Sequence, residues 1–236
     1  MTDPPADLEH QPLDSAVHRG LLLAIIERGR ASSASELASA LGESEERVRD
    51  SLARLDANHG LVLHPGGFEP WLVHPFSTTP TAFYVEGAER GWWAPCVWCA
   101  LGVAHLVPGP VRIHGRLGGE AEPCCVDFDA GRLTPAGLVA HFPIPVARAW
   151  DNVHRFCGST LIFSATDAVD GWCERHGVAR GEVVPLEQVA ELARVWYGGH
   201  LAPDWRKPTA SEARTRLESV GLTADHWRVP GGDERF

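Results

Sequence analysis

Helix-start and helix-stop residues divide the first third of the chain into short segments. Apolar residues from Leu21 onward recur at helical spacing until Gly29, which ends the pattern. Ser33 and Glu36 form the capping-box pattern of a helix start, and Gly42 stops the helix that follows. A further serine then caps a segment that places its apolar side chains on one face. These signals predict three short helices, at residues 21–30, 33–41 and 44–56.

A β-hairpin is predicted directly after these helices. The stretch GLVLHPGGFEPWLV, residues 60–73, has two apolar runs around a Pro-Gly-Gly turn. Three helices and a hairpin make a winged-helix-like module, which we assign to residues 14–80 after a disordered tail at 1–13. The third helix carries four acidic residues against three arginines, and the net charge of the chain is −10. This charge disfavours nucleic acid as a partner, and a structural or dimerising role is the alternative.

The remaining residues, 81–236, are predicted to form a core of antiparallel strands and helices. AFYV at 82–85 has strand composition after prolines that break helices. The apolar segment 96–107 indicates a buried helix, with prolines near its start and after its end. Further strands are predicted within 111–144 and at 159–164, and further helices at 167–176, 184–197 and 211–220. The expected fold class is therefore α+β, with the winged-helix-like three-helix module packed on a core of antiparallel strands and helices.

The compartment can also be predicted from the sequence. No apolar run approaches the roughly 20 residues that a membrane span needs. The first 20 residues are acidic and proline-rich, and they lack the basic and apolar regions of a secretory signal. We therefore expect a cytoplasmic protein. Thiols stay reduced in the cytoplasm, so the six cysteines need not pair as disulfides.

Cys96 and Cys99 stand in an apolar, tryptophan-rich stretch, GWWAPCVWCALG, at residues 91–102. Three apart on a helix, they would share one face, and the amides of the first helical turn would lower the pKa of Cys96. One function of such a cysteine pair is redox chemistry. A thioredoxin-type motif, however, follows a βαβ unit, and the sequence before residue 91 does not predict one. A structural zinc site with Cys124 and Cys125 is another, although adjacent cysteines chelate poorly. A soft-metal site is the third. Structural roles are expected for Cys124, Cys125 and Cys173.

Several stretches of the chain resemble the organomercurial (alkylmercury) lyase family. WWAPCVWCALG looks like the active-site helix of that family, and WDNVHRFCGSTLIFSATDAVDGWCERHG, residues 150–177, is similar to its second cysteine signature. HPFSTTPTAFYV and PLEQVAELARVWYGGHLAPDWRKPTASEA are also similar to members of the family. The resemblance extends over most of the chain, as far as Trp227.

The resemblance implies that two thiolates capture R–Hg⁺ and that an acid protonates the leaving carbon. By position, Cys96 is the first thiolate, Cys157 is the second, and Cys99 stands where the family has aspartate. Cys99 would then donate the proton, or act as a third ligand that retains the metal. A second alignment, on the letters WCAL, makes Cys99 the first thiolate and puts Gly102 at the acid position. No cofactor is required, mercury or another soft metal is bound as substrate or product, and small thiols are expected partners.

Other functions are compatible with the same residues. The chain could be a non-catalytic thiolate protein that binds or senses Hg²⁺ or Cu⁺, or a thiol oxidoreductase using Cys96 and Cys99. The fold could also serve a different carbon–heteroatom substrate. Asp151 and His154 precede Cys157 and could supply a proton, although such side chains are usually exposed. Under the first alignment, replacing Cys99 by aspartate should preserve or raise protonolysis.

Overall fold

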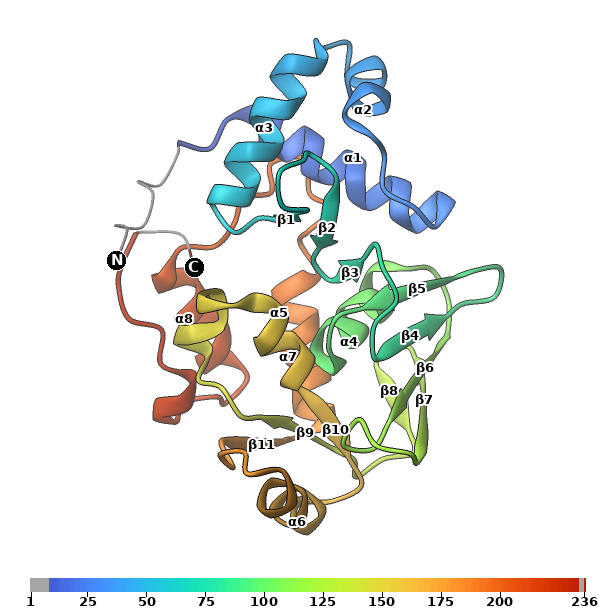
Figure 1. The fold of residues 1–236 in the computed structure, drawn as a ribbon, viewed down its shortest axis with the longest axis vertical. Coiled ribbons are helices and arrows are strands. Elements are labelled where there is room, and N and C mark those ends of the chain that lie inside the picture. The colour runs from blue at the N-terminus through green and yellow to red at the C-terminus, as the bar shows by residue number, and fades with distance from the viewer. Residues whose placement is uncertain (1–8, 234–235) are drawn as a thin grey trace.

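The computed structural model describes residues 9–233 and 236, and it confirms the predicted α+β class (Figure 1). The helices are α1 (Pro12–Arg28), α2 (Ala34–Leu41), α3 (Glu45–Ala57), α4 (Val97–Leu106), α5 (Val153–Ser159), α6 (Thr166–His176), α7 (Leu186–Tyr197) and α8 (Ala210–Ser219), with 3₁₀ helices at Val146–Asp151 and Asp225–Trp227. The strands are β1 (Val62–Leu63), β2 (Pro70–Val73), β3 (Phe76–Ser77), β4 (Phe83–Glu86), β5 (Gly91–Ala94), β6 (Val111–Arg116), β7 (Pro123–Asp129), β8 (Arg132–Thr134), β9 (Val139–Phe142), β10 (Leu161–Phe163) and β11 (Glu182–Pro185). None of the helices in the described ranges combines the length and apolar character that a membrane crossing requires.

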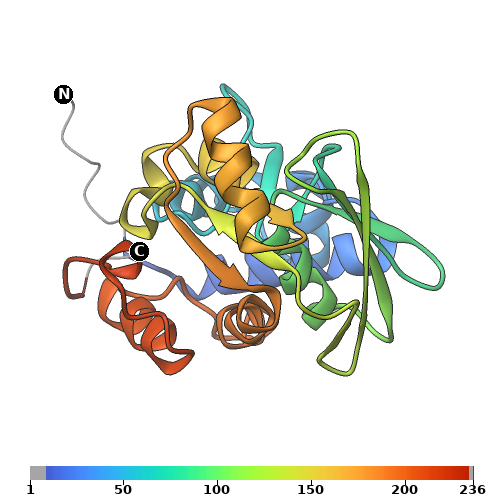
Figure 2. The same ribbon diagram turned by 90° about the horizontal axis from the view of Figure 1, so that it is seen from below.

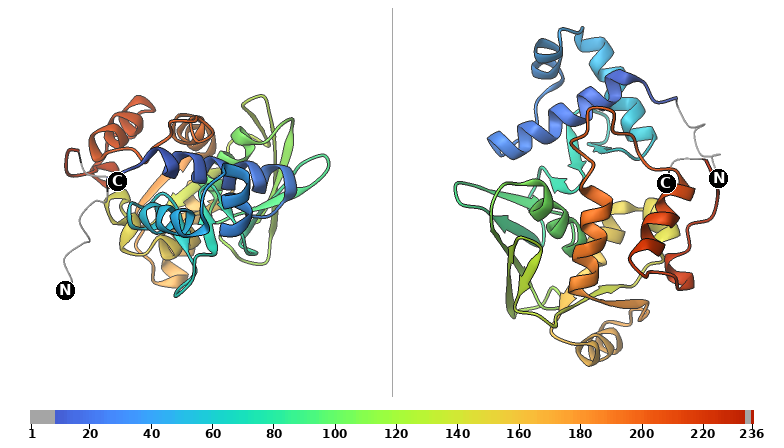
Figure 3. Two further views of the ribbon diagram at one scale, coloured as in Figure 1. Left: turned by 90° about the horizontal axis from the view of Figure 1, so that it is seen from above. Right: turned by 180° about the vertical axis from the view of Figure 1, so that it is seen from behind.

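An antiparallel sheet of eight strands forms one side of the molecule, in the order β1-β2-β3-β5-β4-β6-β7-β8. Successive residues of a strand point to opposite faces, so Val85, Ile113 and Val126 share the inner, buried face. Helix α4 packs on this sheet and against α7. Seen from behind, α4 and α7 lie side by side at the centre of the molecule (Figure 3). The sheet and α7 therefore hold α4 from two sides.

The three predicted N-terminal helices are present. The capping box of Ser33 and Glu36 starts α2, and Ser44 caps α3. Helix α1 begins at Pro12 and not at Leu21, because a capping box at its N-terminus and a proline in its first turn start the helix earlier. The tail expected at 1–13 therefore includes the first two residues of α1. The rest of that prediction concerns mainly residues 1–8, which lie outside the described residues.

The β1–β2 hairpin is present where the sequence predicts it, but it belongs to the main sheet. β2 pairs with β3, and β3 pairs with β5, so the hairpin continues into the strands of the core. Leu21 of α1 and Leu52 of α3 also belong to the same hydrophobic cluster as Leu101 of α4. The stretch 14–80 thus shares both its sheet and its apolar core with the rest of the chain.

A second sheet, β10-β9-β11, has three strands and is covered by α6 (Figure 2). The sequence predicted one helix over 184–197, which is wrong at its start. Val183 and Val184 instead pair with β9 as part of β11, and α7 begins after Pro185. β-branched residues favour strands, and proline has no amide hydrogen to continue a helix backward. Strand β5 and helix α5 were not predicted.

Candidate active site

The C-x-x-C stretch lies at the start of α4. Cys96 is the N-cap residue, with an extended backbone at φ −154° and ψ 174°. Its Sγ accepts a hydrogen bond from the backbone N–H of Cys99 at 3.3 Å. The sequence placed Cys96 inside the first helical turn, whereas it precedes that turn and caps it. In this position the sulfur faces amide groups that have no partner within the helix.

Cys157 is held by α5, the short helix that the sequence did not predict. The Asn152 side chain caps this helix by accepting a hydrogen bond from the N–H of Arg155. Phe156 and Cys157 are the buried residues of α5. The helix therefore turns one short apolar face, which includes the thiol, toward the interior.

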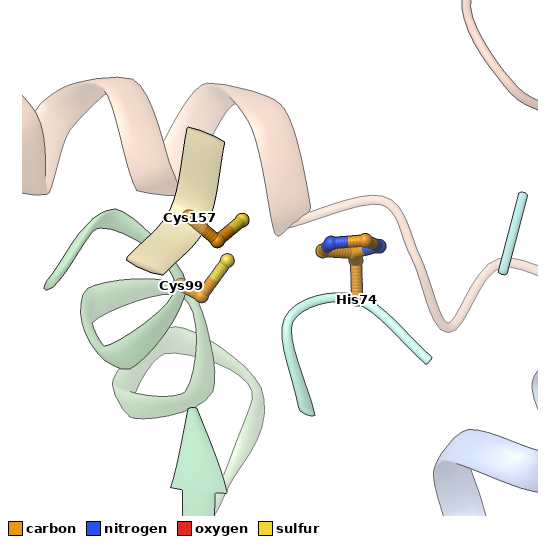
Figure 4. Close-up of side chains that lie close together, drawn as sticks. All are labelled: His74, Cys99 and Cys157. Carbon is orange, nitrogen blue, oxygen red and sulfur yellow. The ribbon is translucent and has the colours of Figure 1, made fainter. Parts of the chain in front are cut away.

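The three cysteines of the predicted site come together although they lie far apart in the chain. The thiols of Cys157 and Cys99 lie close enough to that of Cys96 to lower its pKa. One ligand atom from each of Cys99, Cys157 and His74 lies within 4.8 Å of the other two. The two sulfurs sit side by side and face the His74 ring, which comes from the turn between β2 and β3 (Figure 4).

The three thiols of this cluster differ in how readily they ionise. Burial opposes ionisation of Cys96, but hydrogen bonds from Cys157, Cys99 and two backbone amides outweigh it and lower its pKa well below the usual value. Burial and the neighbouring Cys96 charge raise the pKa of Cys99. The hydrogen bonds to Cys96 and Cys99, together with burial, raise the pKa of Cys157. Of the three thiols, Cys96 therefore ionises most readily, whereas Cys99 and Cys157 favour the protonated form.

His74 completes the cluster as a neutral imidazole. Burial is the main cause that lowers its pKa to about 3. Its Nδ1 has no hydrogen-bond partner among the described residues. Sulfur and imidazole nitrogen are ligands that soft and borderline metals prefer. The arrangement is therefore suited to a thiophilic metal.

A cavity of about 50 Å³ opens onto Cys99 and Cys157. Its volume exceeds the roughly 10–15 Å³ that a single water needs on this measure. Cys96 does not line it and is fully buried. Seven of the eighteen residues that line the cavity are aromatic: Trp98, Trp150, Phe156, Trp196, Tyr197, Trp205 and Phe236. A ligand that enters from the cavity would thus meet Cys99 and Cys157 before Cys96.

Tyr197 contacts the cluster from α7. Its hydroxyl lies 3.4 Å from Sγ of Cys99. Its ring also packs on Gly102, where an added Cβ would lie 2.3 Å from the ring. Burial and the nearby cysteine charges raise the pKa of Tyr197 well above its usual value, so the phenol keeps its proton. The position that the second alignment assigns to the acid thus has no side chain, and a tyrosine ring occupies the space.

Lys207 brings a titratable amine to the same cavity. Its Nζ lies 4.1 Å from the centroid of the Trp150 ring, a cation–π distance. Burial and Arg216 lower the pKa of Lys207, which the Cys157 charge partly offsets, and the value is about 7. His200 also lines the cavity, and burial lowers its pKa so that it is neutral.

The other candidate residues lie elsewhere. Within the described ranges, the cluster of His74, Cys99 and Cys157 is the group whose ligand atoms could hold a metal, so the four-cysteine zinc site is not formed. Cys124 packs on the core and Cys125 is exposed, as strand alternation predicts. Neither of the two proton donors considered, Asp151 and His154, lines the cavity. Both are exposed: Asp151 pairs with Arg148, and His154 packs on Trp71.

A buried cluster of thiols beside an aromatic cavity defines a protein for soft-metal chemistry. The alkylmercury lyase (MerB) family profile matches residues 76–198, more than half of the chain, and both cysteine motifs lie within them. The chain is 28% identical over 183 residues to the alkylmercury lyase of Streptomyces lividans, covering 73% of this chain and 78% of that protein. Its fold is similar to the mercury-bound form of MerB2, with a TM-score of 0.62 and 22% identity over 80% of this chain and 89% of that chain. The chain belongs to the alkylmercury lyase family.

Three residues of the site were missed from the sequence: His74, Tyr197 and Lys207. His74 lies between two short apolar runs and next to a proline, where a turn histidine carries no distinctive spacing. Tyr197 ends an amphipathic helix and reads as a core aromatic. Of the three, Lys207 has a signal in the sequence, which is its rarity. Arginine supplies most of the 21 lysine and arginine residues of this chain.

Proposed function

We propose that the protein cleaves the carbon–mercury bond of organomercurials, with Cys99 and Cys157 as the mercury ligands. The observation that carries this proposal is that these two sulfurs lie side by side at the cavity and face a neutral His74. Thiolates are the ligands that mercury prefers. The aromatic wall suits the organic group, because ligand sites are mostly apolar with a few placed polar groups. This arrangement favours the second alignment over the first.

In this proposal Cys96 serves as the internal base. As Cys99 binds the mercury of R–Hg–X, its proton passes to the Cys96 thiolate, and X⁻ leaves with its electron pair. Cys157 then binds the same mercury, and the carbon–mercury electron pair leaves with the carbon. The proton released from Cys157 joins that carbon as R–H. The cluster thus supplies two thiolate ligands and one proton without a carboxylic acid, and small thiols would afterwards remove Hg²⁺.

Contacts around the cluster support these roles. Cys96 lies close to both of the other thiols, so the Cys99 proton has a short path to it. The Tyr197 hydroxyl lies against Sγ of Cys99 and can hold that sulfur in place. Substitutions test the division of roles among the three cysteines, and the unmodified protein tests turnover.

The decisive variant is Cys99→Asp. We expect it to abolish hydrocarbon release if Cys99 is a mercury ligand, because a carboxylate is a poor ligand for mercury. Under the first alignment it should instead preserve or raise release. The measurement is a single turnover of reduced protein with phenylmercury and excess small thiol, with benzene followed by gas chromatography.

Two further variants complete the test. Cys157→Ser should abolish benzene release, whereas Cys96→Ser should slow it about 10²-fold or more, the usual effect of losing a general base. Cys173→Ser is the control, because that buried thiol lies on α6 outside the cavity. Tight mercury binding without benzene in the unmodified protein would overturn the lyase proposal and favour a non-catalytic three-thiol metal-binding protein.

A further inference from the structure

Three chemically active side chains meet on the outer face of the main sheet, opposite α4. Glu86 lies on β4, His114 on β6 and Cys125 on β7. His114 is directly paired with Cys125 in the strand register, and Glu86 is paired with the residue two before His114. The Glu86 and His114 side chains are 56% and 40% exposed, and Cys125 is also exposed. The sheet itself therefore places a thiol, an imidazole and a carboxylate in a row at the surface.

Hydrogen bonds connect Glu86 to His114 and His114 to Cys125. Nε2 of His114 lies 2.6 Å from a carboxylate oxygen of Glu86, and Nδ1 lies 3.5 Å from Sγ of Cys125. Because the carboxylate accepts from Nε2–H, the neutral imidazole has its free lone pair on Nδ1. That lone pair faces the thiol. A nucleophile next to a base that a third group orients is the general arrangement of an activated nucleophile.

We propose that Cys125 is an activated surface thiol that captures soft electrophiles, organomercurials and Hg²⁺ among them, with His114 as its base and Glu86 as the positioning residue. The step is a substitution at the electrophile. The Cys125 S–H bond breaks, its proton passes to Nδ1 of His114, and sulfur bonds to mercury. The displaced ligand X leaves with its electron pair, and it or the solvent then takes the proton from His114. R–Hg–X becomes R–Hg–S–Cys125, and HX is released.

The neighbouring Cys124 gives a natural comparison. It points to the other face of β7 and packs on the hydrophobic core, and burial raises its pKa. Two adjacent thiols of the same strand therefore differ in both exposure and access to a base. The inference does not depend on carbon–mercury cleavage, because the row lies across the sheet from the α4 cysteines.

Arg112 and Arg116 flank His114 on the same face of β6, and Arg116 donates hydrogen bonds to the backbone carbonyls of Glu120 and Ala121. Arg112 follows the same face of β6 and binds Asp127 of β7 through two hydrogen bonds, of 2.7 and 3.1 Å. Tyr84 of β4 lies beside the His114 ring. With Arg112 and Asp127 paired, Glu86 is the charge that bears most directly on His114.

The test is the alkylation rate of each cysteine by iodoacetamide, followed by peptide mapping across a range of pH. We expect Cys125 to react faster than Cys124, and His114→Gln to slow Cys125 about tenfold, a conservative value for losing a base. Glu86→Gln should also slow Cys125, and Glu86→Asp should restore most of that rate, because it keeps a carboxylate that orients the His114 ring. Cys124→Ser is the matched control and should leave the Cys125 rate unchanged. An unchanged Cys125 rate in His114→Gln, or equal rates at Cys124 and Cys125, would overturn the proposal.

Mercury capture is measured separately in the Cys96→Ser, Cys99→Ser, Cys157→Ser triple variant. One equivalent of phenylmercury should protect Cys125 from later alkylation more than Cys124 or Cys173. Protection of another cysteine in preference to Cys125 would contradict capture at this site. Cys125→Ser alone should release benzene in a single turnover as the unmodified protein does, so loss of capture and loss of cleavage can be told apart.

Discussion

At the scale of single residues, Gly102 and Tyr197 determine the shape of the site beside Cys99. Gly102 lies inside α4, where glycine costs helix stability relative to alanine. Its lack of a side chain lets the Tyr197 ring approach the helix and brings the hydroxyl to Sγ of Cys99. Gly102 therefore lowers the intrinsic stability of α4 but permits its contact with α7.

We predict that Gly102→Ala destabilises the protein by about 1–3 kcal/mol, the usual cost of overpacking a core. The new methyl group would lie 2.3 Å from the Tyr197 ring, which must move away from Cys99. Gly171→Ala is the matched control, because Gly171 is also helical but its nearest neighbour is the flexible end of Arg175 at 3.6 Å. That variant should gain up to about 1 kcal/mol. Urea denaturation measures both, and equal effects would contradict the role assigned to Tyr197.

At the scale of elements, Asp14 of α1 fixes the position of α3. Its carboxylate is 1% exposed and accepts hydrogen bonds from Arg54 and Ser51 of α3. It also accepts from the backbone of Gln11 in the cap of α1. Polar groups at a helix–helix interface are tolerated only when they are paired. This network therefore holds the two helices at a defined register in addition to their apolar contacts.

Replacing Asp14 by alanine should destabilise the protein by about 3–5 kcal/mol, because the Arg54 charge, 16% exposed, would lose its buried partner. Glu45→Ala is the control. Glu45 and Arg49 pair at the surface of α3, with both side chains more than 40% exposed, and such pairs contribute at most about 1 kcal/mol. Thermal or urea unfolding distinguishes the two variants. Similar losses in both would mean that the Asp14 network has no special structural role.

At the scale of the whole molecule, buried histidines join the N-terminal helices to the C-terminal segment behind the cavity. His18 of α1 stacks on Trp205 with ring centroids 3.5 Å apart, and His200 packs on the same tryptophan. Burial lowers the pKa of His18 to about 3. The His18 ring is therefore neutral in the folded protein near pH 5, whereas it takes up a proton in the unfolded chain below about 6.5.

Stability should consequently fall as pH drops from about 6.5 toward 3. For a group with a lowered folded pKa, the unfolded state binds more protons in this window, so acid favours unfolding. Each such histidine contributes a slope of up to about 1.4 kcal/mol per pH unit. His18→Gln should reduce the slope by about that amount when urea denaturation is compared at pH 7, 6 and 5. An unchanged slope would show that His18 is not the titrating group.

The sequence alone determined many of the local elements and revealed the two cysteine motifs. Serine caps, glycine stops and apolar periodicity act within a few residues, so α2, α3 and the hairpin could be located. Both cysteine motifs also lie in continuous stretches, which made the family resemblance visible. Where local signals conflicted, at the start of α1 and before α7, the boundaries were wrong because capping and strand pairing outweighed the helical pattern.

The tertiary structure alone decided which side chains form the site. His74, Tyr197 and Lys207 come from a turn, a helix end and a loop far apart in the chain, and no spacing links them to the cysteines. In the folded chain Cys99 and Cys157 line the cavity, whereas Cys96 is buried and does not line it. Burial and hydrogen bonding then set which thiol carries the charge, since these depend on neighbours that only the folded chain brings together.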